Sequence, residues 1–398
     1  MKIVGGIYGE HCVLPDWNQV FGSGGRAAAA LANWCPGLEL LGYADAASSQ
    51  DIWATMSAFG VDVHLVESPE LLQFSYFHPL SNPDINPPPH LATPLPSIQV
   101  EGDLVLRFGM LEGEAQVFAK TAVYDPQTGI CPERFRANGS HADRLAIVLN
   151  QVELERLTEG ENPANAPVRL LSEEKAEVLI LKSGVHGASV WTRDGMVGSV
   201  PAYRSTRIFK IGSGDVFSAA FAWVWGYEGR DPLEAADLAS RAVAHYCNTQ
   251  QLPIPDVREL AGLSPLPTGK TPGRIYLAGP FFDIGQRWVV EEALECLERL
   301  GATVFSPYHN VGLGGTDNAL AQADLRGLES CDAVFAILNG SDPGTIFEVG
   351  YARDRGMPVV ALAEDIYTRD LTMMAGSGCE IVDDFASAIY RALWASMK

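Results

Sequence analysis

Two acidic residues near the C-terminal end, Asp342 and Glu348, are spaced so that both could act on one bond. They lie in NGSDPGTIFEVGYA (339–352), where a Pro-Gly turn separates Asp342 from the apolar, helix-forming run that contains Glu348. A retaining displacement at a sugar C1 needs one carboxylate as nucleophile and a second acid to protonate the leaving group. The same spacing also fits an acid that starts a turn and another that favours a helix N-terminus. The spacing alone leaves both interpretations open.

Short apolar runs and helical patterns alternate around these acids. IYLAG (275–279) is typical of a buried strand, and 286–301 of an amphipathic helix closed by Gly301. Further strands are predicted at 302–307, 332–338 and 358–363. This alternation predicts a small flavodoxin-like, doubly wound parallel sheet. Ligands of such sheets bind beyond the carboxyl ends of the strands, where Tyr276, Asp342 and Glu348 fall; Asp324 lies on the helix before the strand at 332–338.

A second pattern, FKIGSGDVFSAAFAWVW (209–225), places Gly-x-Gly-Asp before an apolar helix. Gly212 and Gly214 would let backbone N–H groups approach an anion at the helix N-terminus, and Asp215 could orient or deprotonate an attacking hydroxyl. Glycine-rich turns before helices are common, so this motif alone does not decide between phosphoryl transfer and a plain turn. Lys182 and His186, in the turn KSGVHG, are interpreted as exposed loop residues.

The sequence predicts three parts. Residues 1–262 alternate strands and helices, 263–273 form a Pro- and Gly-rich linker, and 274–398 form the smaller domain. The Pro-rich stretch 68–96 is interpreted as a loop or lid within the first domain, because apolar patterning resumes on both sides of it.

Composition excludes several classes of partner. The balance of 28 Lys+Arg against 49 Asp+Glu gives a net charge of −21, which argues against nucleic acid or an anionic membrane surface. The seven cysteines form no CxxC pair, no run of 18 apolar residues occurs, and the N-terminus does not look like a signal, so we expect a cytoplasmic protein with reduced thiols. The eight histidines are scattered, and no residue is assigned as a direct metal ligand.

Three segments of the C-terminal part, IYLAGPFF, ADLRGLESCDAVFAIL and DPGTIFEVGYARDRGMPVV, together resemble the nucleoside 2-deoxyribosyltransferase family. The resemblance covers about 274–390 and implies that Glu348 attacks C1′ to form a glycosyl-enzyme intermediate, without a cofactor. It implies that Asp342 and Asp324 bind and protonate the leaving base and that Tyr276 holds Glu348. The two further residues expected to bind substrate or anion on this side are Gly279 and Gly344.

The chain departs from this family in LTMMAGSG, where Thr372 stands at the position expected for an asparagine that a neighbouring subunit contributes. A hydroxyl replaces an amide only in part, which affects recognition of the sugar 5′ end or the balance of transfer and hydrolysis. Because sites of this family are completed by a neighbouring subunit, we expect a homo-oligomer.

The N-terminal part resembles the PfkB carbohydrate kinases, with their ribokinase-like three-layer fold, over about residues 1–260. The segments that carry this resemblance, in order, are GSGGRAAAALANW, AVYDPQ, NQVELERLTEG, LILKSGVHGASVW and the Gly-x-Gly-Asp turn. It implies Asp215 as catalytic base, Gly212 and Gly214 as the anion hole, and the segment from Asn150 to Glu153 near Mg²⁺ and the phosphates of ATP.

The sugar pocket of that family is not matched. Phe209-Lys210-Ile211 stands where an Asp-Thr pair is usual, Ala29 replaces the sugar-binding asparagine, and the early substrate aspartate is Glu10 or missing. Two functions therefore stay open. One is an enzyme that cleaves or transfers the N-glycosidic bond of a nucleoside or nucleotide, with a kinase half acting on a nucleoside or pentose. The other is a nucleotide-sensing protein whose kinase half is degenerate and which has no turnover.

Overall fold

The computed structural model describes residues 1–397 apart from 92–94, 128–131, 159–161, 163, 268–269 and 313. The chain divides into two compact units, Met1–Thr268 and Gly269–Lys398. The division falls inside the predicted linker, two of whose residues, 268 and 269, lie outside the described residues. The linker's first part packs on the N-terminal unit, since Leu266 is buried and its N–H donates to the carbonyl of Ala202.

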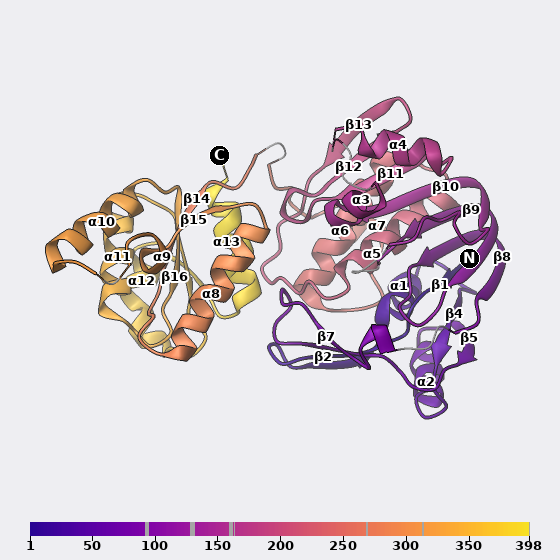
Figure 1. Ribbon diagram of the computed structural model, residues 1–398, viewed down its shortest axis with the longest axis horizontal. Helices are drawn as coiled ribbons and strands as arrows, with labels where there is room; N and C mark the ends of the chain where they lie inside the picture. The colour runs from indigo at the N-terminus through magenta and orange to yellow at the C-terminus, as the bar shows by residue number, and fades with distance from the viewer. Residues whose placement is uncertain are drawn as a thin grey trace. The chain divides into compact units, whose positions relative to one another are not determined.

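In the described part of the N-terminal unit, the main sheet has nine strands in the order β13-β12-β11-β10-β9-β8-β1-β4-β5 (Figure 1). The neighbours from β11 to β5 are all parallel, and β12 and β13 extend one edge antiparallel. The strands of this sheet are β1 (Lys2–Val4), β4 (Glu39–Ala44), β5 (Asp62–Glu67), β8 (Ile98–Phe108), β9 (Ala115–Asp125), β10 (His141–Asn150), β11 (Val178–Lys182), β12 (Ala188–Thr192) and β13 (Gly195–Val200).

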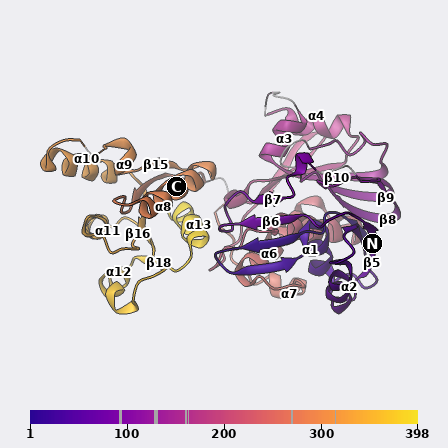
Figure 2. The ribbon, with the colours of Figure 1, turned by 60° about the horizontal axis from the view of Figure 1, so that its bottom comes forward.

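A smaller sheet in the same unit has the order β3-β2-β6-β7, and Figure 2 shows β6 and β7 side by side. Its strands are β2 (Gly9–Cys12), β3 (Trp17–Val20), β6 (Gln73–Tyr76) and β7 (Asp84–Asn86). The Pro-rich stretch 68–96 thus supplies two strands of this sheet. Its residues 92–94 lie outside the described part of the chain.

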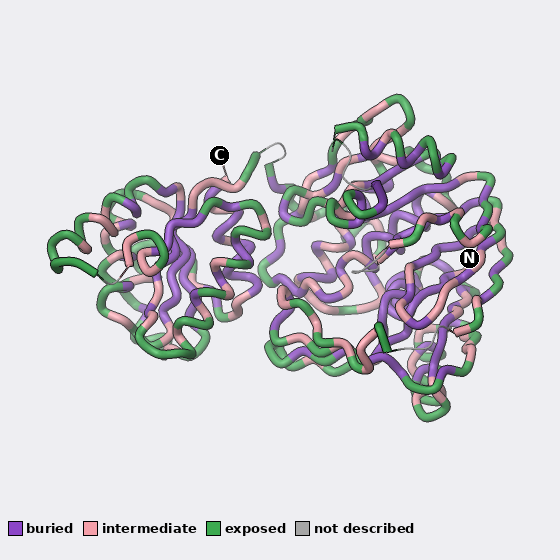
Figure 3. The backbone as a smooth tube through the Cα atoms, viewed as in Figure 1, coloured by how far each residue is buried: buried purple, intermediate pink, exposed green. Residues whose placement is uncertain are grey.

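Helices pack on both faces of the main sheet. Alternate residues of β10 enter two different hydrophobic clusters: Ala146 and Val148 pack with α1, α5 and α6, whereas Leu145 and Ile147 pack with α3 and α4. Figure 3 shows the strands of this sheet as largely buried. The helices of the unit are α1 (Gly22–Leu31), α2 (Ser49–Ala58), α3 (Gln151–Leu157), α4 (Ala166–Glu173), α5 (Ser213–Phe221) with the π-helical Ala222–Tyr227 after it, α6 (Pro232–Thr249), α7 (Val257–Leu260) and the 3-10 turns Pro89–Leu91 and Gly184–His186.

Three neighbouring strands of this sheet are unusually long. β8 and β9 have 11 residues each and β10 has 10, about twice the common strand length. Residues 109–114, all of them described, join the parallel strands β8 and β9 without a helix. Parallel neighbours are usually joined by a dozen or more residues that include a helix. An extended segment therefore crosses the sheet where a helix is usual.

The described residues of the C-terminal unit form a five-stranded parallel sheet in the order β15-β14-β16-β17-β18. Numbered within the unit this order is 2-1-3-4-5, so the predicted flavodoxin-like arrangement is confirmed. The strands are β14 (Arg274–Ala278), β15 (Thr303–Phe305), β16 (Ala333–Ile337), β17 (Val359–Leu362) and β18 (Glu380–Val382). The helices are α8 (Ile284–Arg299), α9 (Pro307–Asn310), α10 (Asp317–Glu329), α11 (Pro343–Asp354), α12 (Thr372–Gly376), α13 (Phe385–Ser396) and the 3-10 turn Thr368–Leu371.

Six of the seven cysteines are buried free thiols, and Cys131 lies outside the described residues. Every helix in the described part of the chain is too short or too polar to cross a membrane.

Candidate functional sites

Tyr276 and Glu348 form the centre of the C-terminal site. Tyr276 is a buried residue of β14, and its hydroxyl donates to Oε1 of Glu348, on α11, at 2.5 Å. The Tyr276 ring stacks on Phe305 with 5.6 Å between the ring centroids. Gly327 makes room for Phe305, since a Cβ at Gly327 would lie 2.2 Å from that ring. Packing around Tyr276 thus fixes the position of the Glu348 carboxylate.

Burial, together with the negative charges of Asp324 and Asp342, raises the pKa of Glu348 to about 7, and the hydrogen bond from Tyr276 limits this rise. Burial also raises the pKa of Asp324, on α10. Oδ1 of Asp324 is buried without a hydrogen-bond partner in the described part of the chain. Three carboxyl groups therefore share one poorly hydrated region, and two of them hold a proton more readily than usual.

Asp342 is the N-cap of α11: its Oδ2 accepts hydrogen bonds from the backbone N–H of Thr345 at 2.7 Å and from the Thr345 hydroxyl at 2.9 Å. The structural interpretation of the spacing has Asp342 start a turn and Glu348 favour the helix N-terminus, but the residue at the helix N-terminus is Asp342. Glu348 lies in the second turn and bonds Tyr276. Gly344 is in the first turn of α11, where a Cβ would lie 3.0 Å from Oδ2 of Asp342.

The remaining predicted residues of this site are Gly279 and Thr372. Gly279 follows β14, and a Cβ there would lie 3.2 Å from side-chain atoms of Ile337, so close packing requires a glycine. Thr372 begins α12, is exposed, and donates its hydroxyl to the carbonyl of Arg369 at 2.8 Å.

Asn339 and Glu364 were not singled out from the sequence. The Asn339 amide donates to Oε2 of Glu364 at 2.9 Å, and its oxygen accepts the Glu364 backbone N–H at 3.0 Å. Burial raises the pKa of Glu364. The two residues follow β16 and β17, so the rule that ligands bind beyond strand ends would have found them.

In the N-terminal unit, the Asp215 carboxylate is held by two neighbours. Asp215 is buried in the first turn of α5, its Oδ2 lies 3.3 Å from Nη1 of Arg26, and Gln127 donates to its Oδ1. Burial raises the pKa of Asp215 to about 6, and the Arg26 charge and the Gln127 hydrogen bond limit the rise. Asp215 is therefore a carboxylate at neutral pH, with a hydrogen bond on each oxygen.

Arg26 is the hub of this site and was not assigned a role from the sequence. Its guanidinium is fully buried, forms a two-pronged ion pair with Glu10 of β2 and donates from Nε to the Tyr246 hydroxyl at 2.9 Å. A Cβ on Gly212 would lie 2.0 Å from Nε of Arg26, and Gly212 also has a φ of +72°. The need for glycine at Gly212 thus follows from Arg26 as much as from anion binding.

Lys182 borders the other glycine of the motif. Its Nζ donates to Oδ2 of Asp125 at 2.7 Å, and a Cβ on Gly214 would lie 3.5 Å from that Nζ. The interpretation of Lys182 as an exposed loop residue is wrong. Lys182 is the last residue of β11, beside α5, and its side chain is only 17% exposed. Oδ1 of Asp125 is buried and has no partner among the described residues.

Asn150 and Glu153 cap a helix reciprocally. The Asn150 side chain accepts the Glu153 N–H at 3.0 Å, and Glu153 Oε2 accepts the Asn150 N–H at 2.8 Å, at the start of α3. Burial raises the pKa of Glu153; the Lys182 charge opposes the shift and the Asp125 charge adds to it. Glu153 therefore lies near the Lys182 pair, while Asn150 is occupied by the cap.

A family model described as nucleoside 2-deoxyribosyltransferase matches residues 275–384. The C-terminal unit therefore contains a nucleoside 2-deoxyribosyltransferase-family domain. Tyr276, Asp324, Asp342 and Glu348 all lie within the matched range of this domain.

The N-terminal unit is similar to solved carbohydrate kinases. A fructokinase double mutant from Vibrio cholerae O395, with fructose, ADP and potassium bound, matches with a TM-score of 0.50 and 15% identity, covering 65% of this chain and 97% of that chain. A microbiome-derived acarbose kinase matches at 0.48 and 15%, covering 66% and 97%. A pyrophosphate-dependent kinase of the ribokinase family matches at 0.46 and 13%, covering 65% and 98%. The fructokinase likeness confirms the predicted ribokinase-like fold. No curated protein matches the chain.

The hydrogen bond to Glu348 of the deoxyribosyltransferase-family domain predicts how Tyr276→Phe changes stability with pH. When the pKa of a carboxyl is higher in the folded state than in the unfolded state, the protein loses stability as the pH rises. This loss takes place between the unfolded pKa, about 4.3, and the folded pKa. Loss of the hydroxyl removes a group that lowers the pKa of Glu348, so the pKa should exceed about 7 and the loss of stability should be larger. Urea unfolding from about pH 5 to pH 8.5 should show this extra loss, on the order of 1 kcal/mol. Adding Glu348→Gln should abolish it, and an unchanged slope in Tyr276→Phe would contradict the assignment.

Arg26 should be essential to the folded N-terminal unit, because Arg26→Met leaves the Glu10 and Asp215 carboxylates buried without their cation. Removing one partner of a buried ion pair costs about 3–5 kcal/mol. The free energy of unfolding measures this, and Lys120→Gln is the matched control, because the Lys120–Asp103 pair is exposed and its loss should change stability little. Equal small losses in both variants would show that the buried network is not stabilising.

Proposed function

We propose that the C-terminal domain cleaves the N-glycosidic bond of a nucleoside, deoxynucleoside or its 5′-phosphate through a glycosyl–Glu348 intermediate. The observation that supports this most is the Tyr276–Glu348 pair, because it holds one oxygen of a poorly hydrated carboxylate, and the other oxygen has no hydrogen bond to a described residue. Membership of the deoxyribosyltransferase family gives the reaction class.

In the first step, Oε2 of Glu348 forms a bond to C1′ while the C1′–N bond to the base breaks and the base leaves with a proton. Asp324 is the better donor of that proton, because burial raises its pKa and its Oδ1 has no hydrogen-bond partner in the described part of the chain. Asp342 has one oxygen engaged by Thr345 and a second free to accept a hydrogen bond from the base. In the second step, water or another base attacks C1′ and gives its proton to the Asp324 carboxylate, and the bond to Glu348 breaks.

Glu348→Ala and the isosteric Glu348→Gln should abolish base release and base exchange while the fold persists, because the nucleophile is gone. The measurement is chromatography after incubation with deoxynucleosides, nucleotides and a second acceptor base, with circular dichroism to verify folding. Glu295→Gln, an exposed acid on α8, is the control and should keep full turnover. Full turnover in Glu348→Gln would refute the assignment. Binding without any freed base in the wild type would favour a nucleotide sensor instead.

A second proposal concerns the N-terminal domain: transfer of a phosphoryl group from Mg·ATP to a hydroxyl of a nucleoside or pentose. Asp215 at the start of α5, a carboxylate at neutral pH, and the Lys182 ammonium beside Gly214 support it. Lys182 and the N-terminal turn of α5 would hold phosphate, and the unpartnered Asp125 oxygen fits Mg²⁺. The acceptor hydroxyl would replace the Arg26 N–H as the hydrogen-bond donor to Oδ2 of Asp215. The Arg26–Asp215 ion pair is longer than the Arg26–Glu10 ion pair.

ATP consumption with Mg²⁺ should depend on an acceptor and disappear in Asp215→Asn, because the amide cannot take the hydroxyl proton, while Glu348 chemistry persists. The acceptors to test are nucleosides, deoxynucleosides, ribose and deoxyribose, with Glu348→Ala as the matched variant that should retain ATP use. If none of these acceptors stimulates ATP consumption in the intact protein, the domain binds without phosphoryl transfer and the second proposal fails.

A further inference from the structure

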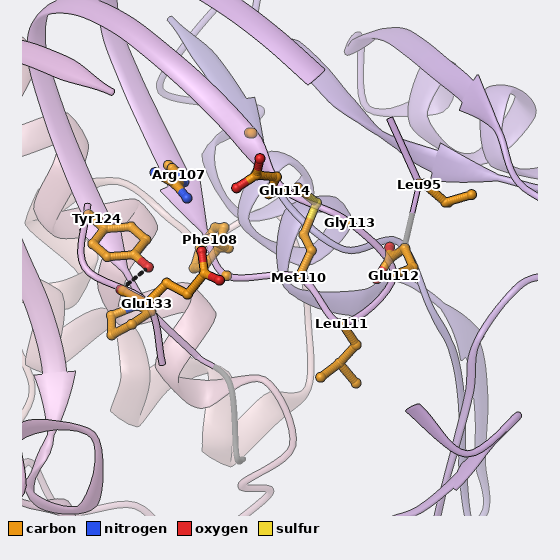
Figure 4. A pocket seen from close by; sticks show the side chains of 13 residues that line it. Leu95, Arg107, Phe108, Met110, Leu111, Glu112, Gly113, Glu114, Tyr124 and Glu133 are labelled. Atoms are coloured by element: carbon orange, nitrogen blue, oxygen red, sulfur yellow. Dashed lines mark hydrogen bonds between the residues drawn. The ribbon is translucent and has the colours of Figure 1, made fainter. Parts of the chain in front are cut away.

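A cavity of about 320 Å³ lies in the N-terminal unit beside the segment that crosses the sheet, residues 109–114 (Figure 4). Its walls combine this crossing segment with the ends of β8 and β9. None of the residues discussed for phosphoryl transfer or glycosidic cleavage lines it. The lining residues are Leu95, Arg107, Phe108, Gly109, Met110, Leu111, Glu112, Gly113, Glu114, Ala115, Tyr124, Pro126 and Glu133.

Arg107 is the unusual member of this wall, because it is a buried cation without a carboxylate partner among the described residues. The side chain is 3% exposed, and its hydrogen bonds all leave from Nη1, to the carbonyl of Phe135, the Ser140 hydroxyl and the Asn138 oxygen. Among the described residues, Nε is buried without a hydrogen-bond partner, and Nη2 takes part in none of the hydrogen bonds of this side chain. The Nε–Nη2 edge, one of the edges with which arginine binds carboxylates in pairs of hydrogen bonds, is therefore vacant.

Stacking on aromatic rings offsets only part of the free-energy cost of burying the Arg107 charge. The Arg107 guanidinium lies 4.9 Å from the Tyr124 ring centroid and 5.6 Å from that of Phe135. Such contacts contribute less than a paired carboxylate inside a protein. An anionic group bound in the cavity would supply the missing partner.

The other charges of the wall are all negative. Glu112 is buried and accepts the Tyr8 hydroxyl at 2.7 Å, Glu114 accepts the Asn138 amide at 3.1 Å, and Glu133 lies at the exposed margin. In Figure 4, Arg107, Tyr124 and Glu133 lie on one side of the cavity and Glu112 on the other. With three carboxylates against one guanidinium, the wall disfavours a polyanion such as a nucleotide or sugar phosphate. It favours a ligand that has an acidic group for Arg107 and a cationic group for the glutamates.

The crossing segment is held in place without a ligand. The Leu111 N–H donates to the Tyr8 hydroxyl at 3.3 Å, and the carbonyl of Glu114 accepts the Ile98 N–H at 2.9 Å and the Tyr43 hydroxyl at 3.1 Å. The cavity is at the small end of ligand pockets, and its wall includes the apolar side chains of Leu95, Met110 and Leu111 beside the charged ones. These properties fit a small molecule with an apolar side chain.

We propose that this cavity binds a free α-amino acid with an apolar side chain, its carboxylate on Arg107 and its ammonium on Glu114 and Glu112. The ligand would fill the vacant edge of the guanidinium and balance the excess of carboxylates. The site is separate from both proposed reactions, and binding there does not require either of them.

Isothermal titration of the full-length protein with the free amino acids tests this proposal, with leucine and its decarboxylated amine as a matched pair. We expect one-to-one binding of an apolar amino acid, at least about tenfold weaker binding of the amine, which cannot engage Arg107, and no binding of ribose 5-phosphate. Glu114→Gln keeps the size and the Asn138 contact, and it should weaken binding about tenfold or more, as expected for loss of a charge-assisted hydrogen bond. Glu101→Gln, on the exposed face of β8, should leave binding unchanged.

Arg107→Met should remove binding as well. Because this substitution can also disturb packing, the result for Glu114→Gln decides the test if the two variants give different results. The proposal is overturned if no amino acid binds at concentrations up to about 10 mM, a range that covers weak metabolite sites. It is also overturned if ribose 5-phosphate or a divalent cation binds in place of amino acids, or if Glu114→Gln binds as the wild type does.

Discussion

The buried guanidinium of Arg26 is the interaction on which the architecture of the N-terminal site depends. It joins β2 through Glu10, α5 through Asp215 and α6 through Tyr246, and it originates on α1. Four elements from two separate stretches of the chain, 9–31 and 213–249, therefore meet at one cation, and Glu10, Asp215 and Tyr246 each lose a hydrogen bond if it is removed. A buried charge is tolerated only when its partners surround it, so the small sheet, the main helices and the Gly212 turn must assemble together.

The C-terminal site solves the same problem of a buried carboxylate in the opposite way. Asp215 lies beside a cation, whereas Glu348 receives a hydrogen bond from a neutral hydroxyl and has other acids as neighbours. A cation stabilises the charged form strongly and occupies the carboxylate, but a single hydroxyl leaves one oxygen free and the charge poorly stabilised. That difference favours Glu348 as the nucleophile of the chain. In the proposed phosphoryl transfer, an acceptor at Asp215 would have to compete with Arg26.

Local patterns were enough to predict the strands and helices that carry the C-terminal acids, because each runs from a buried apolar segment to a Gly or Asp at its end. The pairing of Tyr276 with Glu348 entered only through resemblance to a family, since the two are 72 positions apart in sequence. Arg26 could not be predicted, because an arginine inside an Ala-rich helix gives no sign that two acids from other elements will surround it. Lys182 was misjudged for the same reason: a turn motif shows local exposure, while Asp125, which holds the lysine, comes from a different strand.

The contrast between Arg26 and Arg107 follows from how the sheet is covered. Arg26 receives one carboxylate from β2 and one from α5, and its charge is balanced within the fold. Arg107 lies under a crossing segment that is too short to form a helix, so aromatic rings and neutral oxygens surround it and a cavity remains beside its vacant edge. Replacing a helix by six extended residues removes the side chains that would have filled that space. The short connection 109–114 between β8 and β9 thus leaves a cation and several carboxylates facing a cavity of molecular size. A zwitterion could pair with both kinds of charge.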